Sequence, residues 1–321
     1  MEYPNNLLSR RDVLRLGTAA LATLPVIDAL AAGSGYFARN KFPIGLQLYT
    51  VGDLARKDLE GTLKRIADIG YETIELAGLH GHTVPELRAA ADAVGLKLVS
   101  IHISADSRPG ELSLNGDLHA LAQSAHQLGV TDVVMPMFVT PSRLGAPATG
   151  EGFLAYLNRV VPQFTVDDWK RTAAQLNGYG KTLRQEGLKF GYHNHNPEFA
   201  PLPGDTNGFE ILLKETDPKL VSFELDIGWA AAAGQDATRL MSVHKGRITQ
   251  LHVKDIQAST KTNYTLQQDP TEVGSGSLDW ASLLSSAKTA KISRYFVEQE
   301  PPFAGDRLDA IAKSLRYLKS L

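Results

Sequence analysis

The sequence contains no cysteine among its 321 residues. Disulfide bonds, thiolate nucleophiles and cysteine-ligated zinc sites are therefore excluded, which leaves histidine and carboxylate side chains as candidate metal ligands. A strong net charge is also missing, because 33 Lys and Arg nearly balance 35 Asp and Glu. Without a strongly positive surface a chain is a poor binder of nucleic acid, so we expect no nucleic-acid partner.

A long apolar run is absent as well. The stretch at residues 16–27 is only weakly apolar, and Thr, Gly and Pro interrupt it, so it is a poor membrane span. It follows Arg10 and Arg11 and precedes Ala29 and Ala31, which is the order of parts in a twin-arginine export signal. This order predicts a cleaved signal peptide and a periplasmic protein with no stable membrane anchor. An amphipathic N-terminal helix is the alternative.

Eight short apolar runs alternate with eight segments of helical spacing in the rest of the chain. The expected strands are 43–49, 71–76, 97–103, 132–137, 190–199, 221–229, 248–255 and 295–300. The expected helices are 58–70, 83–95, 114–129, 166–186, 206–216, 236–245, 278–290 and 306–321. This alternation predicts an α/β protein whose parallel strands close into a single (β/α)8 TIM barrel.

An open doubly wound sheet is the alternative fold. It needs a glycine-rich phosphate turn after the first strand, and residues 46–51 offer none. The long segment 139–165 contains Gly and Pro and is interpreted as a functional loop or lid over the strand ends. We divide the chain into a twin-arginine-type signal peptide (1–31), a linker (32–42) and the barrel (43–321).

Polar side chains occupy the positions that should face the barrel interior. Apolar residues of each strand pack against the outer helices, so the polar residues that alternate with them point inward. The inward set is Gln47, Glu75, His102, Glu224, Asp226, His252, Lys254, Glu298 and Glu300, and His193 and His195 share one face if their run is extended. Titratable groups in an apolar tube are costly unless they bind a cation or a polar ligand.

One divalent metal would satisfy these groups. His193, Asp226 and His252 are each about one βα unit apart, so they come from consecutive strands, and Glu298 comes from the next. Two imidazoles and two carboxylates suit Mn, Zn, Fe or Co better than Mg or Ca. Manganese is the preferred ion. The sequence leaves open whether His193 or His195 is the ligand from the fifth strand.

Five motifs resemble the xylose-isomerase-like barrel superfamily, and within it the sugar phosphate isomerase/epimerase group that includes ketose 3-epimerases and inosose dehydratases. They lie at residues 192–199, 224–228, 252–255, 274–280 and 298–300. The resemblance implies that His193, Asp226, His252 and Glu298 bind one metal. The epimerases have a glutamate where this chain has His193, so the usual two-base epimerisation is not assured.

The resemblance further implies a metal-dependent sugar isomerase or epimerase. It would remove a proton next to the carbonyl of a sugar or keto-sugar, through a metal-bound enediolate. The predicted export argues that this substrate is not phosphorylated. The expected proton-transfer residues are Glu298, His195 and Lys254, and the expected substrate contacts are Gln47, Glu75, His102, Glu198, Trp229 and Glu300. Glu224 is expected to orient a ligand rather than to bind the metal.

Three other functions compete with this interpretation. A dehydratase or lyase of a keto-sugar or keto-glycoside begins with the same proton removal. An exported sugar-binding barrel could keep the fold without turnover. An endonuclease IV-like nuclease shares the fold, but it needs more metal ligands and a basic groove. Whether the protein is a monomer or a homo-oligomer is left open.

Overall fold

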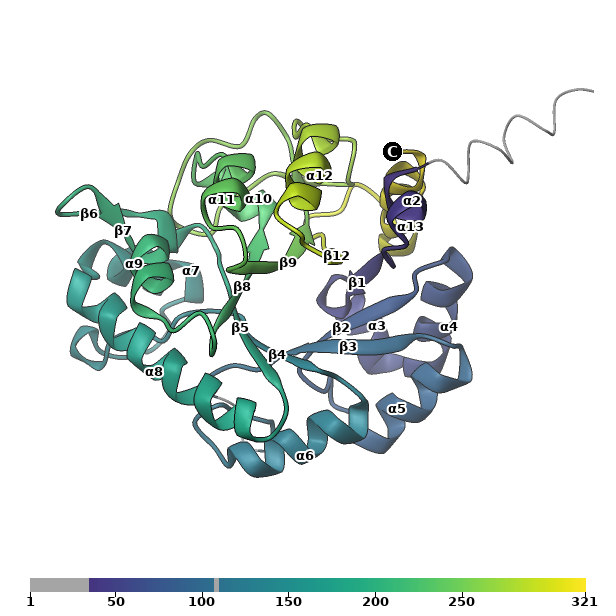
Figure 1. Ribbon diagram of the computed structural model, residues 1–321, viewed down its shortest axis with the longest axis horizontal. Helices are drawn as coiled ribbons and strands as arrows, with labels where there is room; N and C mark the ends of the chain where they lie inside the picture. Colours follow the sequence, from purple (N-terminus) through teal and green to yellow (C-terminus); the bar gives the residue numbers. More distant parts are fainter. Residues whose placement is uncertain (1–34, 107–109) are drawn as a thin grey trace, which may run out of the picture.

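The computed structural model describes residues 35–106 and 110–321, so the predicted signal peptide (1–31) lies outside the described residues. Eight parallel strands close into one barrel surrounded by helices (Figure 1). Around the barrel the strands are β1 (Gly45–Gln47), β12 (Arg294–Val297), β9 (Ile248–Val253), β8 (Ser222–Asp226), β5 (Lys189–His193), β4 (Asp132–Met135), β3 (Lys97–His102) and β2 (Thr73–Ala77). The predicted (β/α)8 barrel is confirmed.

All eight predicted helices are present on the outside of the barrel. They are α4 (Leu59–Ile69), α5 (Val84–Ala93), α6 (Leu118–Leu128), α8 (Val166–Gln185), α9 (Gly208–Glu215), α11 (Ala237–Val243), α12 (Trp280–Thr289) and α13 (Arg307–Ser320). Their amphipathic spacing explains the packing: in α4, Leu63 and Ile66 are fully buried against the barrel. The helix ends at Gly70, whose φ of 107° suits only glycine well.

Shorter elements fill the connections between these helices and strands. They are α2 (Tyr36–Asn40), η2 (Leu48–Val51), α3 (Gly52–Lys57), η3 (Ser142–Leu144), α7 (Phe153–Val160), η4 (Val161–Gln163), η5 (Pro197–Phe199), β6 (Pro201–Leu202), β7 (Thr206–Asn207), α10 (Ile227–Ala232), β10 (Asp255–Ile256) and β11 (Pro270–Thr271). Within the described ranges, no helix combines the length and the apolar character needed to cross a membrane.

Two of these short helices lie where the sequence predicted irregular chain. Helix α2 falls inside the stretch interpreted as a linker, and it packs beside α13 (Figure 1). Its Tyr36 and Phe37 are buried, and the hydroxyl groups of Tyr36 and Tyr295 lie 2.8 Å apart. Helix α7 interrupts the segment predicted as a loop or lid, because its Tyr156, Leu157 and Val160 are buried.

Every barrel strand except β2 ends earlier than predicted, because the chain turns as soon as it reaches the carboxyl end of the barrel. After β8 the chain enters α10 directly, with the Asp226 carboxylate accepting a hydrogen bond from the backbone N–H of Trp229 (2.8 Å). Strand β5 ends at His193. His195 therefore lies in a loop, so the predicted extension of this strand to residue 199 was wrong. The rings of His193 and His195 nevertheless lie on the same side, 4.9 Å apart, as predicted.

Asp255 anchors the loop at residues 273–280 to the end of β9. Its fully buried carboxylate accepts hydrogen bonds from the indole Nε1 of Trp280 (2.8 Å) and from the backbone N–H of Gly274 (2.9 Å). Longer hydrogen bonds arrive from the N–H groups of Gly276 and Leu278, both at 3.4 Å. One side chain thus satisfies several donors of a loop that has little regular structure of its own.

Candidate active site

A cavity of about 870 Å³ lies over the carboxyl ends of the strands. Its lining includes residues at or just after the ends of β2, β3, β5 and β12, as expected for a barrel enzyme. Five of the sequence-predicted site residues line it directly besides His193: His102, His195, Trp229, Glu298 and Glu300. The cavity is therefore polar where it meets the strand ends.

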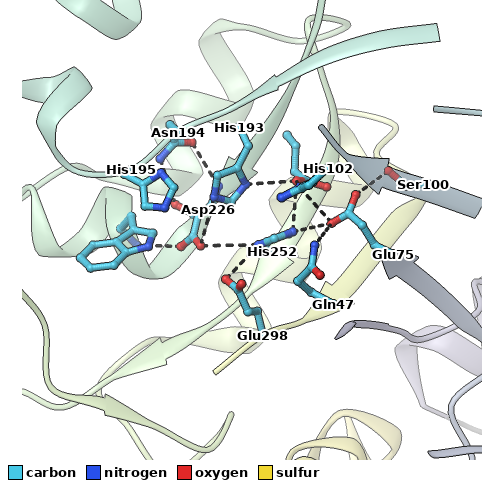
Figure 2. Close-up of polar contacts among 12 residues, drawn as sticks. Gln47, Glu75, Ser100, His102, His193, Asn194, His195, Asp226, His252 and Glu298 are labelled. Carbon is cyan, nitrogen blue, oxygen red and sulfur yellow. Dashed lines mark hydrogen bonds and ion pairs between the residues drawn. The ribbon is translucent and has the colours of Figure 1, made fainter. Parts of the chain in front are cut away.

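His252 lies at the centre of the polar cluster beneath this cavity (Figure 2). Its Nδ1 is 3.1 Å from Glu298 Oε2 and 3.7 Å from Asp226 Oδ2. Its Nε2 is 2.7 Å from Glu75 Oε1 and 3.0 Å from Glu224 Oε2. Both ring nitrogens thus face acidic groups, and the ring joins two sets of possible metal ligands.

The structure brings the possible ligands together in two groups that share His252. The Asp–His–Glu group consists of Asp226, His252 and Glu298, and the three-histidine group consists of His102, His193 and His252 with Glu224. Within each group the ligand atoms lie within 4.8 Å of one another. Three of the four predicted ligands therefore form one group.

His193, the fourth predicted ligand, belongs to the three-histidine group and lies close to the Asp–His–Glu group. Its Nδ1 is 3.1 Å from Glu224 Oε2, and its Nε2 is 3.9 Å from Asp226 Oδ2. The ring of His195 is 4.9 Å from the ring of His193, but His195 belongs to neither group. The geometry favours His193 over His195 as the ligand from the fifth strand, and it brings Glu224 close enough to be a ligand itself.

Lys254 places a positive charge beside the Asp–His–Glu group. Its fully buried Nζ lies 2.6 Å from Glu298 Oε2, 3.0 Å from Asp226 Oδ2 and 2.7 Å from Glu300 Oε1. The side chain has room because residue 228 is glycine: a Cβ there would lie 2.7 Å from Lys254 Cγ. Trp229 lies under the ammonium group, 5.1 Å away, and donates its Nε1–H to Glu300.

The acidic groups of the cluster are held in their charged form. Burial would raise the pKa of Glu298, but Lys254 and His252 outweigh burial and hold that pKa well below its usual range. Burial and the neighbouring Glu75 would also raise the pKa of Glu224, yet His252, His102 and His193 lower it to about 2. These carboxylates can therefore bind a cation at neutral pH without first losing a proton.

The histidines divide into charged and neutral members. Burial would lower the pKa of His102, but Glu75 and Glu224 raise it to about 9. Burial, reinforced by the charge of Lys254, lowers the pKa of His195 to about 3. Burial also lowers the pKa of His193, with His252 adding to the effect. Neutral His193 can donate a lone pair to a metal, and neutral His195 can accept a proton.

The residues present fit a divalent metal ion. The Asp226 Oδ2 atom is buried and accepts no hydrogen bond of acceptable geometry, although Lys254 Nζ lies 3.0 Å from it. Lys254 supplies one positive charge to this oxygen, but Glu224 Oε1 in the three-histidine group is buried without any hydrogen-bond partner, which is costly without a cation. The mixture of nitrogen and oxygen donors suits Mn, Zn, Fe or Co.

Three predicted substrate contacts do not line the cavity. Gln47 donates a hydrogen bond to Glu75 (3.0 Å), and Glu75 is also the partner of His252 and His102. Both side chains point into the barrel as predicted, but they lie in a lower layer of the interior, which the histidines cover. Sequence alternation gives the direction of a side chain and not its depth. In this structure Gln47 and Glu75 support the histidines, and their contact with substrate stays a prediction.

Glu198 is the third predicted substrate contact that does not line the cavity. It is fully buried in the loop after β5. It accepts hydrogen bonds from the Tyr192 hydroxyl (2.7 Å) and the backbone N–H of His195 (3.2 Å). It therefore holds the loop that carries His195. The polar turn sequence beside it gave no signal that this acid would be enclosed.

The protonation of Glu198 gives a test of that burial. Burial raises its pKa to about 8, whereas an unfolded chain has a value of about 4.3. The folded state then holds the proton more tightly, so its free energy of unfolding falls as pH rises from about 4.3 to about 8. Glu198→Gln should lack this decline in the free energy of unfolding, which in the wild type is about 1.4 kcal/mol per pH unit at most.

Urea unfolding at pH 5, 7 and 9 measures the difference between the two proteins. The exposed Glu60 supplies a matched control, because Glu60→Gln should follow the wild-type curve at each pH. Parallel curves for wild type and Glu198→Gln would contradict the assignment of a buried, protonated carboxyl group.

Curated relatives of this chain include two proteins named inosose dehydratase. The relative from Lactiplantibacillus plantarum is 34% identical over 98 residues, so the match spans about a third of that protein, 32% of its length, and 30% of this chain. The relative from Geobacillus thermodenitrificans is 23% identical over 304 residues, which cover 88% of this chain and 98% of that protein.

Solved structures include a sugar phosphate isomerase/epimerase from Parabacteroides distasonis. It matches with a TM-score of 0.66 and 25% identity, over 87% of this chain and 94% of that chain. The model of the family described as "Xylose isomerase-like TIM barrel" matches residues 63–321, which is most of the barrel. The chain therefore belongs to the xylose isomerase-like TIM barrel family, in agreement with its sequence motifs.

Proposed function

We propose that this protein is a divalent-metal-dependent isomerase or epimerase that removes a proton next to the carbonyl of a non-phosphorylated sugar or keto-sugar. The family supports a sugar-processing enzyme. The observation that carries the proposal is the convergence of Asp226, His252, Lys254 and Glu298 at the base of a cavity that can hold a sugar.

Asp226, His252 and Glu298 would hold the metal, with His193 beside them and manganese as the preferred ion. The ion supplies positive charge, which lowers the cost of the negative charge that develops on a carbonyl oxygen when the neighbouring carbon loses a proton. Glu75 and Glu224 accept from the Nε2 side of His252 and so fix the orientation of its ring.

The protein's own proton-transfer groups lie around this set. Neutral His195 lines the cavity, so its imidazole can accept a proton from the substrate carbon. The Lys254 ammonium group, held by Glu298 and Glu300, can stabilise an oxyanion or return a proton. His102, Trp229 and Glu300 line the cavity and can contact substrate hydroxyl groups.

We place this activity in the periplasm. Arg10 and Arg11 precede an apolar stretch and a small-residue cleavage motif, which supports export by the twin-arginine route. That route carries folded proteins, and it suits an enzyme that acquires its metal before export. Export also argues for free rather than phosphorylated sugars.

Proton exchange with solvent tests the proposal. In deuterated water, with manganese added, we expect deuterium to enter one carbon of a sugar or 3-oxidised sugar from a small panel, as followed by NMR. Removal of the metal should stop the exchange. His195→Gln should slow it about 10²-fold and leave the metal content unchanged, because His195 lies outside both ligand groups. Exchange that persists without metal would contradict the proposal.

A dehydratase or lyase is the second candidate, favoured by the two relatives named inosose dehydratase. After the same proton removal, a hydroxyl group on the next carbon would take a proton and leave as water. Lys254 beside Glu300 could supply that proton. Mass spectrometry of the product separates the two reactions, because an isomer keeps the mass of the substrate and a dehydration product lacks one water.

A further inference from the structure

One part of the cavity lining consists of large apolar side chains that face solvent. Among the residues that the structure describes, four large hydrophobic side chains are exposed: Tyr49 (53%), Phe153 (57%), Leu154 (50%) and Val243 (65%). The first three all line the cavity, and Val243 does not. Single exposed hydrophobic residues are common on proteins, but a group of them around one cavity indicates a binding surface.

These three residues, named here the apolar rim, come from two sides of the barrel. Tyr49 lies in η2 after β1, whereas Phe153 and Leu154 begin α7 in the connection after β4. Figure 1 places α7 and β1 on opposite sides of the barrel. Helix α7 is firmly packed, because the Tyr156 hydroxyl donates to the carbonyl of Gly145 (2.9 Å). Phe153 and Leu154 are therefore exposed in the folded state of this helix.

The cavity is also too large for one sugar ring. Its volume of about 870 Å³ is near the upper end of the range for pockets that enclose drug-sized ligands. The deep polar groups His102, His193 and Glu298 lie at the strand ends, and a second polar set at Arg56, His80, His82 and Thr83 lines the cavity farther along the chain from β1 and β2. The lining also includes the apolar side chains of Leu79, Leu112, Met137 and Leu266. A sugar at the polar end would leave this apolar part unfilled.

We propose that the natural substrate is a glycoside with an aromatic aglycone, which reaches the mouth of the cavity and packs against the apolar rim. This inference rests on the proposed function, because the sugar part must occupy the polar end of the cavity. An aromatic ring fits the rim because it buries a large apolar area and can pack edge-to-face or offset against Tyr49 and Phe153. The sugar ring then supplies the carbon that reacts, and the aglycone supplies affinity.

Calorimetry on the manganese-loaded protein tests this with paired probes. Phenyl and methyl glycosides of β-glucose, α-glucose and β-galactose differ only in the aglycone. For at least one pair, we expect the phenyl glycoside to bind about tenfold more tightly. Phe153→Ala and Tyr49→Ala should each reduce that ratio to about two, with little change for the methyl glycoside. Val243→Ala removes an equally exposed side chain outside the cavity and should leave the ratio unchanged.

Several results would overturn the inference. They are a wild-type ratio near one, absence of phenyl glycoside binding in all three pairs, a ratio that the rim variants do not alter, or tighter binding of a disaccharide than of the phenyl glycoside. A change of oligomeric state in the rim variants, without a change of the ratio, would assign the rim to contacts between copies of the chain.

The inference and the proposed function can fail separately. A tenfold preference for the phenyl glycoside without any solvent exchange would support binding of the aglycone at the rim and contradict the proposed enzymatic activity. Solvent exchange on free sugars, with equal affinity for phenyl and methyl glycosides, would support the proposed enzymatic activity and contradict the inference of an aromatic aglycone.

Discussion

Replacing His252 with alanine is expected to remove the bound divalent ion and to lower turnover by more than about 10³-fold. His252 is the one residue shared by both ligand groups, with Nδ1 facing Asp226 and Glu298 and Nε2 facing Glu75 and Glu224. Its loss leaves these acids without their central partner. Metal analysis of the dialysed protein and the exchange assay measure the two effects.

The control is the same substitution at an exposed histidine. His119 on α6 is 65% exposed at its side chain, so His119→Ala should keep both metal and activity. Because His252 is buried, its alanine variant could lose activity by unfolding, so His252→Gln and a urea unfolding curve accompany it. A folded His252→Gln protein with a full complement of metal would show that the ion does not depend on this ring.

Replacing Asp255 with alanine is expected to lower the free energy of unfolding by about 3 kcal/mol or more. The carboxylate is fully buried and accepts from Trp280, Gly274 and two further backbone N–H groups. Without it these donors lose their partner while they remain enclosed, and each buried unsatisfied donor costs about 1–3 kcal/mol. Urea unfolding measures the change.

Asp255→Asn should cost less than alanine, since its side-chain oxygen still accepts hydrogen bonds. Asp92→Ala is the matched control, because Asp92 forms only an exposed pair with Arg88 on the same helix and should contribute less than about 0.5 kcal/mol. Equal stabilities for Asp255→Ala and Asp92→Ala would contradict the view that Asp255 anchors the loop.

The barrel and the direction of its polar side chains could be predicted from sequence alone. Both follow from local regularities: helical spacing between apolar runs, and alternation along each strand. Alternation placed Glu224, Asp226 and His252 inside the barrel, and the structure brings these residues together. The predicted ligands Asp226, His252 and Glu298 lie in one group for the same reason.

The remaining features depend on where strands end and on which layer a side chain occupies. Gln47 and Glu75 point inward but lie below the cavity, and alternation contains no information about depth. His195 entered the site from a loop, which period-two alternation cannot describe. The deep burial of Lys254 requires Gly228 on another element, and a single sequence does not reveal such pairs.

The two halves of the barrel contribute different things to the site. Strands β1 to β4 and their connections supply the rim residues Tyr49, Phe153 and Leu154, whereas the segments from β8 onward supply Asp226, His252 and Glu298. Mutation libraries confined to residues 49 and 153–154 could therefore retune ligand preference while the reacting groups stay intact. Because of this separation, substitutions that change the substrate range during evolution do not alter the residues that carry out the reaction.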